Sequence, residues 1–418
     1  MSPIVPNHSK NLLNRLDWPD VQPNEVFARI ADQPEAIFLD SSSLSQSGDE
    51  ISLLTFEPEE VVHGDLRDTS KLERWLRDNA IESAPDLGFP LGGAFGTIAY
   101  NGEFEFGLYP RILVFRHRTA EWFDYGGLAQ RLPDAPEPRP ALPPLEFQAD
   151  MGKAEFCRLV RKAKDYIAAG DIYQVNLTRR FQAPFPPDLD PFAFYEALRD
   201  ASPAPFSAYL NLCNRQILSS SPEQFLKLSG RGIQTRPIKG TRPRFRDTER
   251  DERSRYDLIT SEKERAELIM ITDLERNDLG QVCEFGSVQA SRLLELETYE
   301  QVFHLVSTVQ GRLKSEINHV NALKACFPGG SITGAPKKRA REIIAELEPI
   351  ERGVYTGTIG YFGLNGESQF NIVIRSAVRE NETLHFHVGA GIVADSEPEL
   401  EFEETRHKAE GFFQASSD

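Results

Sequence analysis

The stretch Phe206–Gly230 reads FSAYLNLCNRQILSSSPEQFLKLSG, and it decides the fold class. It holds three short runs rich in apolar and β-forming residues, at 206–212, 216–222 and 224–230. Only a few residues separate them, so no crossover helix fits between them. Strands that follow one another so directly are typical of antiparallel sheets and argue against a doubly wound α/β fold.

The same pattern continues through the rest of the chain. Further strand-like runs lie at 172–181, 298–313, 354–364, 368–378 and 383–393. Helical spacing of apolar residues predicts helices at 69–80, 151–170, 260–280 and 397–414. Thr260 or Ser261 can cap the third of these helices, and Gly280 can end it. Strands outnumber helices, which predicts an α+β fold with helices packed beside antiparallel sheets.

One break in composition divides the chain. Between Leu132 and Pro144 the sequence LPDAPEPRPALPP contains six prolines, so this stretch is extended and cannot be a helix or a central strand. We interpret it as a linker. It predicts an N-terminal region of residues 1–145 and a longer C-terminal region of residues 146–418.

Composition excludes several classes of function. The chain has 418 residues with 47 Lys and Arg against 64 Asp and Glu, a formal charge of -17, which disfavours nucleic-acid binding. None of the four cysteines forms a C-x-x-C pair, so neither a zinc site nor a disulfide framework is indicated. The first ten residues lack the apolar core of a signal peptide, and no run is long enough to span a membrane. We expect a reduced, cytoplasmic protein.

A basic stretch, RPIKGTRPR, runs from Arg236 to Arg244 around Lys239 and Gly240. Gly240 would allow another group to approach the backbone closely. Burial or nearby cations lower the pKa of a lysine and make it a nucleophile, and the flanking arginines could supply that charge. A solvated loop lysine is the alternative, and spacing alone favours it.

The glycine-rich segment GGSITGAPKK, residues 329–338, resembles a phosphate-binding loop only superficially. Ala335 and Pro336 stand where the Gly-Lys of a Walker A motif should follow, so we reject that motif. A turn leading into a helix could still bind a carboxylate through its amides. A purely structural turn is an equally good interpretation.

Carboxylates recur on two of the predicted helices. Glu264 and Glu267 are three residues apart and share a face, as do Glu397, Glu401, Glu404 and Lys408 on the last helix. Magnesium prefers oxygen ligands and needs few protein carboxylates, so one glutamate from each helix could hold it. Solvated acidic faces are the alternative.

Two basic residues lie in apolar runs. His304 could carry a proton or be a satisfied core histidine. Arg375 could clamp a substrate carboxylate or form an internal salt bridge.

Eight ordered segments resemble the chorismate-utilising enzymes. They are SPEQF, PIKGT, AELIMITDLERNDLG, HLVSTV, FPGGSITGAPKKRA, YTGTIGY, IVIRSAV and GAGIVADSEPELEFEET, and they cover most of residues 151–412. The N-terminal region resembles the more variable part of the large components of such enzymes. The resemblance implies two large, mostly antiparallel β-sheets packed as a sandwich with flanking helices, and a site between them.

The resemblance also implies roles for individual residues. Magnesium is expected on Glu267 and Glu404, with Glu401 nearby, where it would bind the ring carboxylate of chorismate. The residues expected to contact the substrate are Gly240, Thr241, Ser331, Tyr355, Arg375, Gly389, Gly391 and Lys408. Lys239 is the expected nucleophile, Glu223 the expected acid, and His304 is expected near the leaving hydroxyl.

Two positions separate the reactions of the family. Gln174 stands where enzymes that add water to chorismate have a lysine, and glutamine cannot act as that base. Lys239 stands where anthranilate synthases have alanine. The resemblance is therefore to the aminodeoxychorismate synthase component I branch, which makes 4-amino-4-deoxychorismate for 4-aminobenzoate and folate. Anthranilate synthase component I and a non-catalytic regulatory subunit binding chorismate or tryptophan are the alternatives.

Ammonia would have to come from a partner. None of the four cysteines lies in the glycine-flanked context of a glutaminase nucleophile, so the resemblance implies a separate glutaminase subunit. The segments 39–41 and 202–210 loosely match the tryptophan pocket of the family, which leaves tryptophan binding open.

Overall fold

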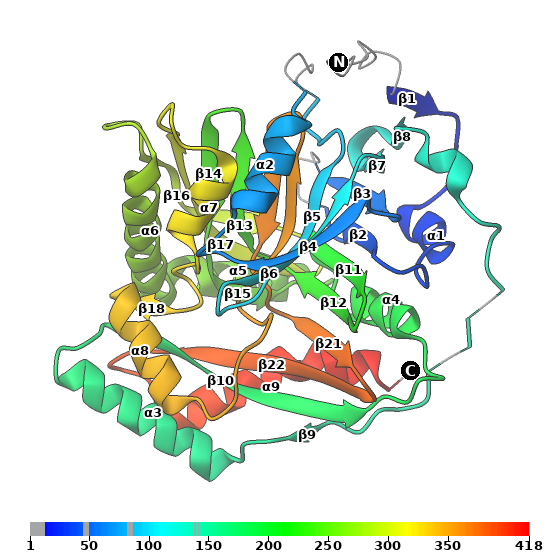
Figure 1. Ribbon diagram of the computed structural model, residues 1–418. Coiled ribbons are helices and arrows are strands. Elements are labelled where there is room, and N and C mark those ends of the chain that lie inside the picture. The colour runs from blue at the N-terminus through cyan, green and yellow to red at the C-terminus, as the bar shows by residue number, and fades with distance from the viewer. Residues whose placement is uncertain (1–12, 45–49, 82–86, 138, 141, 418) are drawn as a thin grey trace.

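Two antiparallel sheets form the framework of the molecule (Figure 1). The computed structural model describes residues 13–44, 50–81, 87–137, 139–140 and 142–417. The first ten residues, where we expect no signal peptide, therefore lie outside the described part of the chain. No helix among the described residues is long and apolar enough to cross a bilayer. The predicted architecture of two antiparallel sheets with flanking helices is confirmed.

The first sheet has twelve strands in the described ranges. In spatial order these are β1 (Leu13–Leu16), β8 (Glu121–Tyr125), β7 (Ile112–Arg116), β3 (Ile51–Thr55), β2 (Ala36–Asp40), β11 (Phe206–Leu212), β12 (Arg215–Ser221), β21 (Ser376–Glu380), β22 (Thr383–Ile392), β10 (Gln174–Pro184) and β18 (Gly334–Ala335), with β9 (Gln148–Ala149) beside β10. The first two strands of the opening stretch lie at the centre of this sheet, because β11 pairs with both β2 and β12, whereas its third strand joins the other sheet.

The second sheet has ten strands in the same ranges. Their order is β15 (Ile238–Pro243), β17 (Val302–Arg312), β14 (Gly232–Arg236), β13 (Gln224–Ser229), β20 (Glu367–Asn371), β19 (Thr358–Gly363), β5 (Gly93–Ile98), β6 (Glu103–Tyr109) and β4 (Glu60–Asp65), with β16 (Gln289–Thr298) beside β17. Both sheets contain strands from either side of the proline-rich stretch. The division at residue 145 stays a prediction as a domain boundary.

The two sheets face each other across a hydrophobic layer. Side chains from the first sheet, such as Ile37 and Leu210, pack with Phe95 and Tyr361 of the second. Phe95 and Tyr361 stack with ring centroids 5.4 Å apart. Burial on this scale is the main driving force that holds the two sheets together.

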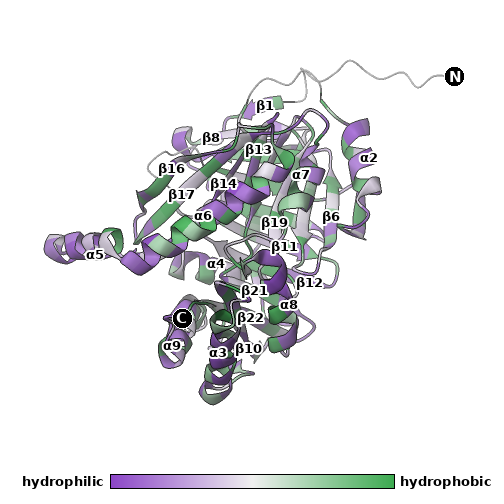
Figure 2. Ribbon diagram, turned by 90° about the vertical axis from the view of Figure 1, so that its left-hand side faces the viewer, coloured by the Kyte–Doolittle hydropathy of each residue, from purple (hydrophilic) through white to green (hydrophobic). Residues whose placement is uncertain are grey.

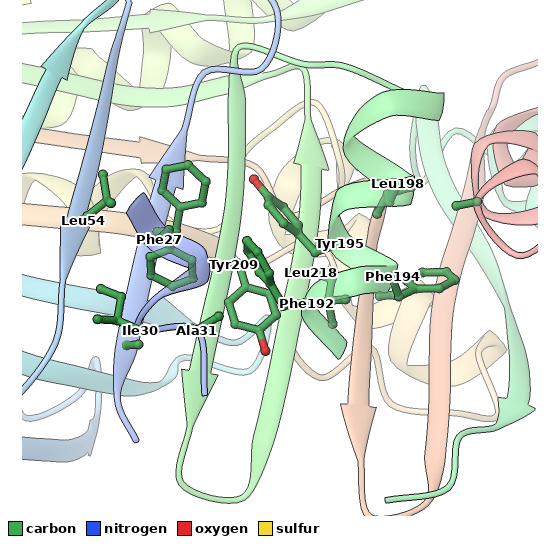
Figure 3. Close-up of a cluster of buried hydrophobic side chains, with 14 of the residues drawn as sticks. Phe27, Ile30, Ala31, Leu54, Phe192, Phe194, Tyr195, Leu198, Tyr209 and Leu218 are labelled. Atoms are coloured by element: carbon green, nitrogen blue, oxygen red, sulfur yellow. The ribbon is translucent and has the colours of Figure 1, made fainter. Parts of the chain in front are cut away.

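Helices cover the outer faces of both sheets (Figure 1). Apart from α5 (Thr248–Thr260), these are α1 (Pro23–Ala28), α2 (Ser70–Asp78), α3 (Lys153–Ala168), α4 (Pro191–Ala201), α6 (Glu262–Val282), α7 (His319–Cys326), α8 (Lys337–Leu347) and α9 (Pro398–Ala415). Under α1 and α4, Tyr209 of β11 contacts Phe27, Phe192 and Tyr195 edge-on or tilted (Figure 3). Residues along β11 are therefore buried on both faces of the sheet.

The structure corrects three details of the predicted elements. Helix α6 continues past Gly280 to Val282, although Ser261 caps it as expected. Helix α5 was not predicted, because its sequence is charged on all sides; Figure 2 shows it projecting from the body of the molecule. The predicted strand at 368–378 is wrong, because β20 and β21 belong to different sheets and the chain leaves β-structure between them.

Candidate active site

Two crossovers between the sheets place charged side chains in the interior. Strand β12 ends in the first sheet at Ser221, and β13 begins in the second at Gln224, so Glu223 lies in the crossover. Arg375 lies in the opposite crossover, from β20 to β21, with a φ of 50°. The crossovers touch, because the Ile372 amide donates to the Glu223 carbonyl at 3.0 Å. The sequence pattern predicted neither crossover.

Lys239 reaches this place from the edge strand β15. The register between β15 and β17 shifts between Lys239 and Thr241, around Gly240 with a φ of 79°. A Cβ at Gly240 would lie 2.6 Å from Leu258 and 3.0 Å from the carboxylate of Glu264, so only glycine fits. The Lys239 ammonium donates to the Ser331 carbonyl at 3.5 Å, and it makes no ion pair with any described carboxylate within 4.0 Å.

The flanking arginines do not supply the free positive charge that the sequence predicted. Each pairs with its own carboxylate: Arg236 with Glu297, Arg242 with Glu264 at 3.2 Å, and Arg244 with Asp251 at 3.0 Å. Their charges are largely neutralised by these partners. The expectation that they act together on Lys239 is therefore wrong.

Glu223 is buried beside Lys239 and Ser331. Its side chain is within reach of the Ser331 hydroxyl, and 5% of the residue is exposed. Burial raises the pKa of the Glu223 carboxyl, while the Ser331 hydrogen bond and the Lys239 charge oppose that rise. A carboxyl with a raised pKa retains its proton longer, which suits a group that donates a proton.

Glu223→Gln is expected to stabilise the fold increasingly as the pH rises above 4.5, the ordinary pKa of a glutamate. The unfolded chain ionises there, but the folded carboxyl resists ionisation because its pKa is raised by burial. The wild-type protein therefore loses stability as pH rises through the folded pKa, and glutamine does not titrate. The melting temperatures of both proteins at pH 4.5 and pH 8 check this. A difference independent of pH would contradict it.

His304 lies across from Thr241 on β17. Its Nδ1 is 2.9 Å from the Thr241 hydroxyl, and only 3% of the residue is exposed. Burial, together with the nearby Arg375 charge, lowers the pKa of His304 to about 3. The imidazole is therefore neutral near pH 7, so it can orient a hydroxyl but is a poor proton donor compared with Glu223.

Arg375 has no carboxylate partner within the described ranges. Burial lowers the pKa of its guanidinium, and no charge offsets this. The internal salt bridge that the sequence left open is thus not what the structure shows. A half-buried guanidinium that pairs with no described carboxylate is suited to clamp a carboxylate from outside the chain.

Strand β22 contributes the opposite wall of the site. The Lys408 ammonium donates to the Gly389 carbonyl at 2.9 Å and pairs with Glu404 at 2.7 Å. A Cβ at Gly389 would lie 3.2 Å from the Tyr355 hydroxyl, and one at Gly391 would lie 2.4 Å from Nε2 of Gln174. The two glycines thus keep space beside polar side chains.

Gln174 and Asn176, which are two residues apart on β10, both lie near Gly391 of β22. Of the two, only Gln174 was singled out from the sequence. Gln174 is fully buried, and neither atom of its amide has a hydrogen-bond partner among the described residues. Asn176 donates from Nδ2 to the Ser331 carbonyl at 2.9 Å. Because side chains alternate along a strand, the period of two from Gln174 could have found Asn176.

The predicted metal ligands come from facing helices. Lys263 of α6 feels the charges of Glu401, Glu267, Glu404 and Glu264, which together raise the pKa of its ammonium against the effect of burial. Burial raises the pKa of Glu267, and Glu264 and Glu404 raise it further against Lys239 and Lys263. Glu264, which the sequence analysis left out of the predicted ligand set, therefore belongs to the same cluster.

These carboxylates fit a cation that keeps other ligands. In the described ranges no three His, Cys, Asp or Glu side chains converge closely enough to cage a metal. Glu401 is held by the Ser396 hydroxyl at 2.6 Å, and its Oε2 is buried without a partner. Magnesium usually binds one or two protein carboxylates and completes its coordination with water and substrate oxygens. Glu267 and Glu404 are therefore enough to hold it, and a closed set of protein ligands is not needed. Magnesium at this place stays a prediction.

A small cavity lies between the sheets near Ser41. The segments 39–41 and 205–208, with Tyr361 and Asn371, line it. The Asp40 carboxylate there is already bonded to Arg199 at 2.7 Å and to the Ser52 hydroxyl at 2.8 Å. The two segments that loosely matched a tryptophan pocket are thus neighbours, and tryptophan binding stays a prediction.

Comparison with known proteins identifies the family. A model of the chorismate binding enzymes matches residues 100–414. The chain belongs to the chorismate binding enzyme family. Its described site residues all lie inside the matched range.

Two relatives with different names are equally similar to this chain. The chain is 46% identical over 278 residues to "Anthranilate synthase component 1 1" of Haloarcula marismortui, covering 65% of this chain and 56% of that protein. It is also 46% identical over 263 residues to "Aminodeoxychorismate synthase component 1" of Bacillus subtilis, covering 63% and 56%. The matches span little more than half the length of these relatives.

The fold of this chain is similar to that of a solved structure from the same family. Anthranilate synthase component I from Streptococcus pneumoniae superimposes with a TM-score of 0.78 at 29% identity, over 87% of this chain and 92% of that one. Family membership and fold are therefore established, whereas the particular reaction of this chorismate binding enzyme is not decided by similarity.

Proposed function

We propose that this protein is an aminodeoxychorismate synthase component I, which converts chorismate and ammonia to 4-amino-4-deoxychorismate. The observation that carries the proposal is the position of Lys239. Its amine lies at the Ser331 carbonyl and near the buried Glu223, and it forms no ion pair within 4.0 Å with any described carboxylate. A lysine of this kind is suited to attack a ring carbon, a step that the other reactions of the family do not need.

The remaining residues would hold the substrate. Arg375 and Lys408 would bind the enolpyruvyl carboxylate, with the Tyr355 hydroxyl beside them. Glu267 and Glu404, with Glu401 nearby, would hold magnesium, which when bound would neutralise the ring carboxylate. Gly389 and Gly391 would let β22 lie close to the backbone of Leu177 and to the side chain of Gln174 on β10.

Two substitutions would then follow. In its neutral form the Lys239 amine forms a bond to ring carbon 2, the two ring double bonds shift, and the hydroxyl at carbon 4 leaves as water with the proton of Glu223. Ammonia next forms a bond to carbon 4, the two double bonds shift back, and the bond from carbon 2 to Lys239 breaks, which frees the neutral amine. The extra proton on the new amino group returns to the Glu223 carboxylate. Covalent catalysis divides one difficult displacement into two easier ones. A separate glutaminase subunit would supply the ammonia.

Anthranilate synthase component I is the second candidate, because a relative with that name is equally similar. In that reaction Lys239 would have no covalent role. Both candidates consume chorismate, so consumption of chorismate does not separate them and the product does.

The test is to identify the product. The purified chain is incubated with chorismate, Mg²⁺ and ammonium, with and without a lyase that cleaves 4-amino-4-deoxychorismate, and the products are separated by mass. We expect 4-amino-4-deoxychorismate alone and 4-aminobenzoate once the lyase is added. Anthranilate in both samples would refute the proposal in favour of the second candidate. Unchanged chorismate would favour a non-catalytic binding subunit.

A further inference from the structure

The loop between α7 and α8, residues 327–336, carries Ser331. Hydrogen bonds to Glu275 and Asp278 connect this loop and its end at Lys337 to α6. In its middle, the Gly330 amide donates to Oε1 of Glu275 at 2.9 Å. The sequence suggested that the amides of this glycine-rich loop could bind an external carboxylate. At Gly330 the chain's own glutamate occupies that role.

A single lysine closes the base of the loop. The Lys337 ammonium donates to Oδ2 of Asp278 at 2.5 Å and to the Cys326 carbonyl at 2.9 Å. Cys326 is the last residue of α7 and Lys337 the first of α8. Lys337 thus ties both ends of the loop to each other and to α6.

The charges in this anchor depend on one another. The side chains of Lys337 and Asp278 are 17% and 5% exposed, and Glu275 is 2% exposed. Burial and the neighbouring Asp278 charge, opposed by Lys337, raise the pKa of Glu275 to about 7. Removing Lys337 alone would leave two buried carboxylates without a cation, which is strongly unfavourable.

The anchored loop touches the groups that are proposed to react. The Ser331 carbonyl, next to Gly330, accepts from the Lys239 ammonium at 3.5 Å and from Asn176 at 2.9 Å. The Ser331 hydroxyl is also within reach of the Glu223 carboxyl. A shift of this loop by an ångström would alter the placement of both Lys239 and Glu223, and misplacement on that scale can lower a rate by about 100-fold.

We propose that Lys337 and Asp278, assisted by Glu275, are positioning residues that hold the 327–336 loop so that Ser331 meets Lys239 and Glu223 together. The inference rests on the proposed function, since it concerns the groups of that reaction. None of the three anchor residues touches the reacting atoms. They act through the backbone of the loop. Their effect on the position of the loop can therefore be measured separately from their effect on the reaction rate.

The test compares Lys337→Met, Asp278→Asn and the double variant, with Lys338→Ala as the matched control. Lys338 is the adjacent lysine and is exposed. We expect each single variant to lower kcat at least about 10-fold while the KM for chorismate stays within about 3-fold, because positioning affects the reaction more than ground-state binding. The double variant should be no slower than the slower single variant, since the pair acts as one unit. The control should stay within about 2-fold of wild type.

The double variant keeps the test decisive if a single variant fails to fold, because it removes the Lys337–Asp278 pair together and leaves neither partner without the other. A double variant that folds and retains the wild-type kcat would overturn the inference, and so would single losses that multiply in the double variant. Hydrogen exchange of the peptide covering 327–336 is a readout independent of product. It should speed up in the double variant and not in Lys338→Ala.

The two failures can be told apart. If wild-type protein leaves chorismate unchanged, the proposed function fails, while the exchange measurement still tests the anchor. If wild-type protein makes product and the anchor variants keep both kcat and slow exchange, only the positioning inference fails.

Discussion

Lys239→Ala is expected to abolish formation of 4-amino-4-deoxychorismate, lowering its rate at least about 1000-fold, equivalent to about 4 kcal/mol in the barrier. The amine at position 239 is the proposed nucleophile, and no other described lysine donates to the Ser331 carbonyl. Without the covalent step, the remaining site could let ammonia attack directly, so anthranilate becomes the expected minor product. Mass spectrometry of trapped protein should show a chorismate-derived adduct on wild type and none on the variant.

Lys227→Ala is the control for this experiment. Lys227 is an exposed lysine on β13, in the same sheet as Lys239. Its removal should leave both the adduct and the product unchanged. An adduct mapped to a lysine other than Lys239, or full activity in Lys239→Ala, would refute the proposed mechanism.

Glu267→Gln is expected to raise the Mg²⁺ concentration needed for half-maximal activity at least about 10-fold, a loss of about 1.4 kcal/mol in binding. Glutamine keeps the shape but removes the charge that attracts the cation. Besides activity, binding of Mn²⁺ followed by electron paramagnetic resonance reports on the site directly. It should weaken by a similar factor.

Glu403→Gln provides the matched control on the facing helix. Glu403 pairs with Lys153 and Arg406, each at 3.5 Å, and so is occupied away from the cluster around Lys263. Its substitution should leave the metal requirement unchanged. If both variants behaved alike, general loss of negative charge and not a ligand would explain the result.

Much of the fold could be predicted from local pattern. Strand β11 coincides with the run FSAYLNL, and α6 begins at the cap that its sequence offered. The crossovers could not be predicted, because Ile372–Arg375 continues an apolar run and nothing local shows that the chain changes sheets there. Which sheet a strand joins is decided by partners far away in the sequence.

The site was predictable to the extent that resemblance supplied it. Lys239, Glu223 and Ser331 do lie together, as do Gly389, Tyr355 and Lys408. The sequence suggested free positive charge beside Lys239, because it shows the three arginines but not the carboxylates that pair with them in the fold. The contacts of Lys337 could not be predicted either, because its partners are Asp278 on another helix and the backbone carbonyl of Cys326.

The sharing of both sheets between distant parts of the chain has a consequence for folding. Phe38 lies opposite Tyr209 in one sheet, and Ile98 lies opposite Thr358 in the other. Topologies dominated by such non-local pairs fold slowly, since long loops must close before the contacts form. Until the last strands arrive, β2 and β5 present open edges on which another copy of the chain can pair. The step most exposed to aggregation is therefore synthesis and refolding, before either sheet is complete.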